Sequence, residues 1–235
     1  LNNHMSDYDI NILEHRRVEK IKDGKLKNLY LSSGEKVQSK AIIIATGAEW
    51  KMLGVEGEKK YNGRGVAFCP HCDGPYYKGK DICVIGGGNS GVEAAIDLSG
   101  IVRSIKLLEF SPKLNADGVL LTKLEKIKNI EIITNARTNK ILGDESKVTS
   151  LEYEDMKSKD IKSLKLDGVF IQIGLVPNSD FLNKLVEINK YGEILVDKKN
   201  KTSLDRVYAA GDVTNVPYKQ IVIAMGEGAK VGLSV

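Results

Sequence analysis

The chain has 235 residues, of which 42% are hydrophobic and 28% charged, and its 35 basic and 31 acidic side chains give a net charge of +4. This composition is typical of a globular protein and argues against disorder, which requires low hydrophobicity and high net charge. The longest apolar runs are far shorter than the roughly 20 residues that span a bilayer. The basic residues form no block, so we expect neither a membrane nor a nucleic-acid partner.

The N-terminal segment has neither the basic region nor the apolar region of a secretory signal. Three cysteines are too few for the disulfide framework of a small secreted protein. We therefore expect a cytoplasmic protein. Because the first residue is Leu1 and not Met, we also expect the chain to be a fragment of a longer protein.

Residues 8–46 are predicted to form a β-meander. The run 8–21 is extended and partly alternating, and 41–44 is a continuous apolar strand. Residues 15–17, His-Arg-Arg, fall within the first run, so we expect them on a solvated sheet face. The polar, glycine-containing stretch 54–65 that follows is typical of a linker.

A strand–helix–strand–helix–strand pattern occupies the middle of the chain. The expected strands are 82–85, 104–110 and 130–134, with an amphipathic helix between each pair. This pattern is the mononucleotide-binding half of a doubly wound sheet, so we predict an α/β fold. From 140 to 173 the period returns to two, which favours a second β-meander on one side of that sheet. A strand at 206–210 and a helix at 220–233 follow.

Three glycines, Gly86, Gly88 and Gly91, follow the first of these strands and open its helix. In a dinucleotide-binding loop the first glycine permits a tight turn and the second lets the backbone approach a pyrophosphate. The third lets the helix pack closely on its strand. Asn89 and Ser90 lie between the second and third of these glycines, and we predict that they also bind the cofactor. A glycine-rich turn without a ligand is the alternative.

Glu109 ends the second strand, 18 residues after the last of these glycines. A carboxylate at this place can accept hydrogen bonds from the adenosine ribose hydroxyls, and it would repel the 2′-phosphate of NADP. The position therefore predicts a ribose contact. A solvated surface glutamate is the alternative.

Cys69 and Cys72 form a CxxC pair, with His71 between them and Asp73 directly after. Such a pair can close a small disulfide ring. His71 can stabilise a thiolate, and Asp73 can move a proton during thiol–disulfide exchange. A zinc site is the alternative, but it needs four ligands and the chain has no second CxxC pair, so we predict no metal. Cys83 is expected to be a small core residue.

Three weaker signals lie outside these motifs. Thr46-Gly47 and Gly211-Asp212 each follow an apolar strand, where backbone can approach a cofactor closely. Gly174 begins a segment that we expect to bend between domains. Taken singly, each is also typical of an ordinary turn.

The segments Cys69–Pro75 and Gly86–Ala95 together resemble the thioredoxin-reductase-like pyridine nucleotide-disulfide oxidoreductases, most closely the branch of the alkyl hydroperoxide reductase F subunits. The resemblance implies a three-layer ββα fold. In it, a Rossmann-like NAD-binding domain at 63–176, carrying the CxxC pair, is inserted into an FAD-binding domain made of 1–62 and 177–235. The family's first glycine fingerprint, which holds the FAD pyrophosphate, is absent from the sequence, so we expect the FAD domain to lack its N-terminal βαβ unit.

The resemblance also implies roles for individual residues. Cys72 is the sulfur nearer the flavin, Cys69 is the exchanging sulfur, and Asp73 is the proton donor. Gln220 and Ile221 open a helix whose N-terminal dipole stabilises reduced flavin. Further implied cofactor-binding residues are Thr46, Gly47, Gly174, Gly211 and Asp212. Glu109 stands where NADPH-dependent relatives carry a basic run, which favours NADH over NADPH.

These expectations combine into a flavin-dependent disulfide reductase. Electrons would pass from NADH through FAD and the Cys69–Cys72 disulfide to a thioredoxin-like domain, and then to a peroxiredoxin subunit. We expect a homodimer. A low-molecular-weight thioredoxin reductase is the first alternative, and a non-catalytic nucleotide-binding or zinc-binding module is the second.

Overall fold

The computed structural model describes residue 5 and residues 7–182 and 184–235, so the first residues of the expected FAD domain, 1–4 and 6, lie outside the described residues. The chain divides into two compact units. The split unit comprises the described residues up to Glu49 together with those of Val176–Val235, and the inserted unit is Trp50–Leu175. Residues 50–62 thus group with the inserted unit. The assignment of the two units to FAD and NAD stays a prediction.

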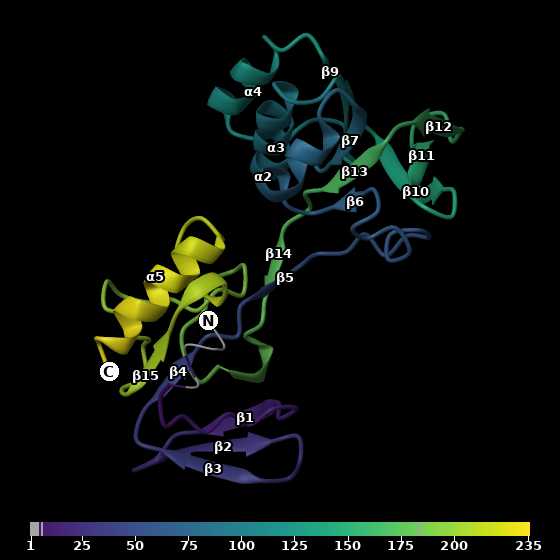
Figure 1. Ribbon diagram of the computed structural model, residues 1–235. Helices are drawn as coiled ribbons and strands as arrows, with labels where there is room; N and C mark the ends of the chain where they lie inside the picture. Colours follow the sequence, from purple (N-terminus) through teal and green to yellow (C-terminus); the bar gives the residue numbers. More distant parts are fainter. Residues whose placement is uncertain (1–4, 6, 183) are drawn as a thin grey trace. The chain divides into compact units, whose positions relative to one another are not determined.

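The inserted unit is built on a five-stranded parallel sheet in the order β6-β13-β7-β8-β9 (Figure 1). Its strands are β6 (Val66–Ala67), β7 (Asp81–Ile85), β8 (Ser104–Leu108), β9 (Ile130–Ile133) and β13 (Gly168–Ile171). Helix α3 (Asn89–Ser99) joins β7 to β8, and α4 (Gly118–Leu124) joins β8 to β9. The predicted strand–helix–strand–helix–strand pattern is therefore confirmed.

Alternating side chains of this sheet fill two cores. Val84, Leu107 and Phe170 belong to a cluster with the buried faces of α3 and α4. Cys83 and Ile85 belong to a cluster with an antiparallel sheet on the other face. Since successive side chains of a strand point to opposite faces, a strand buried on both sides must be apolar throughout, as the central strand β13 is. β8 and β9, nearer the edge, carry the charged residues Lys106 and Glu131. The unit consequently has three layers, ββα (Figure 1).

The antiparallel sheet corrects one prediction. It contains β10 (Ala136–Gly143), β11 (Val148–Asp155) and β12 (Ile161–Lys165), as the period of two indicates. The predicted meander, however, extends to residue 173, whereas β13 pairs in parallel with β6 and β7. All four residues of β13 are buried, which is typical of a central parallel strand and not of a half-exposed meander strand.

The split unit contains a three-stranded antiparallel sheet of β1 (Val18–Lys22), β2 (Lys27–Leu31) and β3 (Lys36–Ser39). The predicted meander is wrong at both ends. Residues 8–17, all of them described, form no strand, and β4 (Ile42–Ile44) leaves the meander to pair in parallel with β15 (Val207–Ala209). Helix α5 (Ile221–Gly232) follows.

Two short strands connect the units. β5 (Ala48–Trp50) and β14 (Leu175–Pro177) are paired with each other. The remaining short elements are α2 (Pro70–Asp73) and the 3-10 helices η1 (Gly74–Tyr77), η2 (Asp180–Leu182) and η3 (Gly211–Val213). Across the part of the chain that the structure describes, no helix is both long enough and apolar enough to cross a bilayer.

The predicted linker at 54–65 is wrong. Glu58 is 1% exposed, and its carboxylate accepts hydrogen bonds from the N–H groups of Leu53 (2.8 Å) and Gly54 (2.7 Å). Tyr61 packs into the core beside the antiparallel sheet. Most of the other polar side chains of the segment are exposed, but the buried Glu58 carboxylate and Tyr61 fix its turns on the inserted unit.

Candidate functional site

The glycine motif forms the connection between β7 and α3. Gly86 has φ +120°, a conformation that side chains rarely adopt. A Cβ on Gly91 would lie 1.8 Å from the carbonyl oxygen of Gly86, so this glycine is required for the helix to approach the strand end. At Gly88 the space that a Cβ would fill is empty to 4 Å among the described residues. Two glycines therefore serve the fold, and the third leaves room for a ligand.

Glu109 follows β8 and is directed at the same loop. Its carboxylate accepts hydrogen bonds from the N–H groups of Gly87 (2.6 Å) and Ser111 (2.8 Å). Glu109 also lines a cavity of about 370 Å³ together with Gly86, and the structure thus brings together the two predicted parts of a dinucleotide site. The solvated-surface alternative for Glu109 does not account for these contacts.

Thr138 lines the same cavity and was not predicted as a site residue. Its hydroxyl oxygen is buried with no hydrogen-bond partner among the described residues. A buried polar atom in this state is suited to a polar ligand group. The sequence carries no signal for it, because Thr138 lies in a strand with no motif around it.

The CxxC pair lies on a single helical turn. Cys69 is the N-cap of α2 and Pro70 its first residue, and α2 gives way to η1 after Asp73. Cys69 and Cys72 form a disulfide with their Cα atoms 5.3 Å apart. Cys72 is exposed, and its N–H donates to Cys69 Sγ (3.2 Å). The pair is therefore oxidised and accessible, as a disulfide-exchange site requires.

Charged groups surround this pair unevenly. His71 Nε2 lies 3.4 Å from Asp97 Oδ2 of α3, and both side chains are more than half exposed. Burial, and then the Asp73 carboxylate, raises the pKa of the Tyr77 phenol.

Cys83 is fully buried in β7, and burial raises the pKa of its thiol far above the ordinary range. As predicted, Cys83 belongs to the core.

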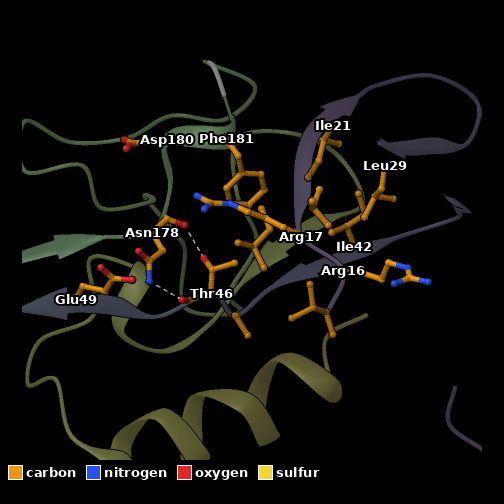
Figure 2. A pocket seen from close by; sticks show the side chains of 14 residues that line it. Arg16, Arg17, Ile21, Leu29, Ile42, Thr46, Glu49, Asn178, Asp180 and Phe181 are labelled. Atoms are coloured by element: carbon orange, nitrogen blue, oxygen red, sulfur yellow. Dashed lines mark hydrogen bonds between the residues drawn. The ribbon is translucent and has the colours of Figure 1, made fainter. Parts of the chain in front are cut away.

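In the split unit, β4 and β15 are parallel neighbours, so the residues after them lie at the same edge of the pair. Thr46 and Gly47 follow β4, and Gly211 and Asp212 follow β15. The Thr46 hydroxyl donates to the Asn178 carbonyl oxygen (2.7 Å), and the Asn178 amide donates to the Thr46 carbonyl oxygen (2.9 Å), as Figure 2 shows. The structure thus gathers four of the predicted flavin-contacting residues.

A cavity of about 510 Å³ lies beside this edge. Thr46 lines it, whereas Gly47, Asp212 and the residues at the start of α5 are not among its lining residues. Arg16, Arg17 and Phe181 line it as well (Figure 2). The prediction that these arginines are solvated is confirmed, because both are exposed, but the predicted strand is wrong, because residues 8–17 form none.

Gln220 and Ile221 are placed as predicted, at the beginning of α5. Gln220 is its N-cap, and the N–H groups of Ile223 and Ala224 donate to the Gln220 carbonyl oxygen. Ile221 is 80% exposed, which leaves this helix start open. Gly174 has φ +105° and accepts a hydrogen bond from the Lys51 N–H (3.0 Å), next to the paired connecting strands.

The chain is similar to proteins of known class over nearly its whole length. The family described as pyridine nucleotide-disulphide oxidoreductase matches residues 3–228. The F subunit of alkyl hydroperoxide reductase of Pseudomonas aeruginosa is 52% identical over 238 residues, covering all of this chain and 46% of that protein. A Bacillus subtilis protein named NADH dehydrogenase is 47% identical over 99% of this chain and 46% of that protein. The chain spans about half the length of the curated relatives it matches.

Solved structures agree with this class. Thioredoxin reductase from Giardia duodenalis has a TM-score of 0.91 at 31% identity, covering 99% of this chain and 76% of that one. Thioredoxin reductase from Streptococcus pyogenes has a TM-score of 0.85 at 32% identity, covering 93% and 71%. The predicted fold class and the predicted resemblance are confirmed. The chain belongs to the pyridine nucleotide-disulphide oxidoreductase family.

Proposed function

We propose that this chain carries the nucleotide-binding and disulfide-bearing part of an NADH-dependent, FAD-containing disulfide reductase. The observation that carries the proposal is the oxidised Cys69–Cys72 pair within the same compact unit as the glycine loop and Glu109. Two electrons and two protons convert such a disulfide into two thiols. The relatives named as the F subunit of alkyl hydroperoxide reductase and as NADH dehydrogenase support this function.

The residues of the inserted unit fit a dinucleotide. The empty space over Gly88 lets a pyrophosphate approach the backbone, and the lone pairs left on the Glu109 carboxylate can accept from ribose hydroxyls. That charge would repel the 2′-phosphate of NADPH, so NADH is the proposed donor. Asp73 supplies a proton to the leaving thiolate, and the His71 imidazole between the two cysteines stabilises that thiolate.

The residues of the split unit fit part of a flavin dinucleotide. Thr46-Gly47 and Gly211-Asp212 meet at one sheet edge, and the start of α5, where the Gln220 side chain makes no capping hydrogen bond to the helix, presents a positive dipole end. FAD, when bound, supplies two-electron transfer between a nicotinamide and a disulfide. We propose that the dithiol then reduces a thioredoxin-like domain serving a peroxiredoxin, in a cytoplasmic homodimer.

Alkylation of the full-length, FAD-loaded protein tests this function. After excess NADH under anaerobic conditions, a thiol reagent should modify Cys69 and Cys72 but not the buried Cys83, which is a control within the same molecule. Without NADH, neither member of the pair should react. If the pair stays oxidised after NADH, the proposed function is wrong.

The second candidate function is that of a thioredoxin reductase acting on a free thioredoxin. Coenzyme preference distinguishes it from the NADH-dependent function proposed above. The solved thioredoxin reductases favour it, because the chain covers 71–76% of the Streptococcus and Giardia enzymes against 46% of the Pseudomonas F subunit. Comparing kcat/KM for NADH and NADPH should show a preference for NADH that Glu109→Ala reduces. A preference of the parent for NADPH would contradict the role given to Glu109.

A further inference from the structure

Asn89 and Asp117 form a reciprocal pair that joins two loops of the inserted unit. Asn89 is the first residue of α3 and Asp117 the N-cap of α4, 28 positions apart. The Asn89 amide donates to Asp117 Oδ2 (2.8 Å), and the Asp117 N–H donates to Asn89 Oδ1 (2.8 Å). Both ends of the Asn89 side chain are therefore engaged within the protein.

The Asp117 carboxylate does not cap its own helix, although Asp117 is the N-cap residue of α4. Such a side chain ordinarily accepts from the N–H groups of its own helix. Here the N–H groups of Leu120 and Leu121 donate to the Asp117 carbonyl oxygen, while the carboxylate accepts from α3. The pair thus links the two helices instead of stabilising only one.

Further contacts continue along the same two loops. The Asn115 N–H donates to the Gly87 carbonyl oxygen (2.8 Å). A Cβ on Gly87 would lie 2.6 Å from Leu114 Cδ2 and 2.7 Å from Glu109 Oε2, so the segment 109–117 covers the middle of the glycine loop closely. Glu109 binds the loop through the Gly87 N–H. The Asn89–Asp117 hydrogen bonds are the last of these contacts, at the starts of α3 and α4.

We propose that Asn89 and Asp117 form a clasp that holds the glycine loop in its nucleotide-binding shape, which makes Asp117 a positioning residue for NADH. The inference rests on the proposed function in that NADH is the ligand. Asn89, predicted to bind cofactor, then acts through the clasp and not as a ligand. A loop that is held beforehand loses less conformational freedom on binding, so the clasp raises affinity without touching the nucleotide.

Nucleotide titration of the full-length protein measures the effect. Asp117→Ala should weaken NADH binding about tenfold, raising KM while leaving kcat unchanged, because one charge-assisted hydrogen bond is lost. Asp117→Asn keeps an acceptor for the Asn89 amide and should restore most of the affinity. Glu125→Ala, which removes an exposed acidic side chain at the other end of α4, should bind NADH like the parent.

Hydrogen exchange without nucleotide tests the clasp separately from the proposed function. The backbone of 111–118 should exchange faster in Asp117→Ala and in Asn89→Ala than in the parent and in Glu125→Ala. Unchanged exchange in both variants would overturn the clasp. Faster exchange with unchanged or tighter NADH binding would overturn the positioning role. If the parent binds no NADH at all, the proposed function fails instead, and the exchange data still decide whether the clasp exists.

Discussion

Alanine substitutions at Gly88 and Gly91 should separate ligand binding from folding, because the two positions differ in their surroundings. A Cβ at Gly91 would lie 1.8 Å from the Gly86 carbonyl oxygen, and real Cβ atoms essentially never come within 3.0 Å. The loop and α3 must therefore part by at least 3.0 − 1.8, or about 1.2 Å. Since overpacking costs about 1–3 kcal/mol and occasionally more, and main chain must move here, we expect Gly91→Ala to lose about 3 kcal/mol of unfolding free energy.

Gly88→Ala should behave in the opposite way. With φ −83° and open space, alanine fits, so we expect the unfolding free energy to stay within about 1 kcal/mol of the parent. The NADH Kd should rise tenfold or more, because the methyl group occupies the approach of the pyrophosphate. Urea denaturation monitored by hydrogen exchange of β7 measures the unfolding free energy, and NADH titration measures the Kd. Gly100→Ala, also in open space at a helix end, is the control. Parent-like NADH affinity in Gly88→Ala would refute the reasoning.

Three further substitutions test the inserted unit. Glu58→Gln should cost about 2–4 kcal/mol, since one of the two acceptor oxygens becomes an NH2 group facing an N–H donor and the other hydrogen bond loses its charge assistance. Glu56→Gln, on an exposed side chain of the same segment, should stay within about 0.5 kcal/mol in urea denaturation. The pKa of Asp81 is lowered to about 2 by its arginine and serine partners, so its contribution is present above pH ~4 and lost as the pH falls toward 2. Asp81→Asn should therefore be less stable than the parent at pH 7 by about 1 kcal/mol or less, with the gap closing in acid. Leu98→Ala should cost about 2–5 kcal/mol in thermal unfolding, against almost nothing for the exposed Asp97→Asn.

Features that depend on neighbouring residues could be predicted from the sequence. The helix between 89 and 99 follows from a glycine motif and an apolar face within eleven residues, and the structure places it there. The disulfide likewise depends on a spacing of three residues. In both cases the physical cause lies within one or two helical turns, so the sequence displays it directly.

Features that depend on distant partners could not be predicted. In the sequence, β13 directly follows the strands of a meander and resembles its last strand. Its actual neighbours, β6 and β7, are far away in the sequence, so the local pattern does not show this pairing. The burial of Glu58 depends on turns whose N–H groups point inward, and no pattern of residue types reveals that direction. Arg17 lines a cavity because the chain before β1 is not a strand, although its alternation resembles one.

Gly74 lets the turn that carries the disulfide pack against the helix that follows the glycine loop. A Cβ on Gly74, directly after the CxxC turn, would lie 2.8 Å from Leu98 Cδ2, so the missing side chain lets α2 lie against α3. α3 begins at the glycine motif, and its other end therefore supports the disulfide. Because all of these residues belong to one compact unit, the spacing between disulfide and glycine loop is set by that unit's packing alone. A substitution at Leu98 should consequently disturb both sites, although it touches neither ligand nor sulfur.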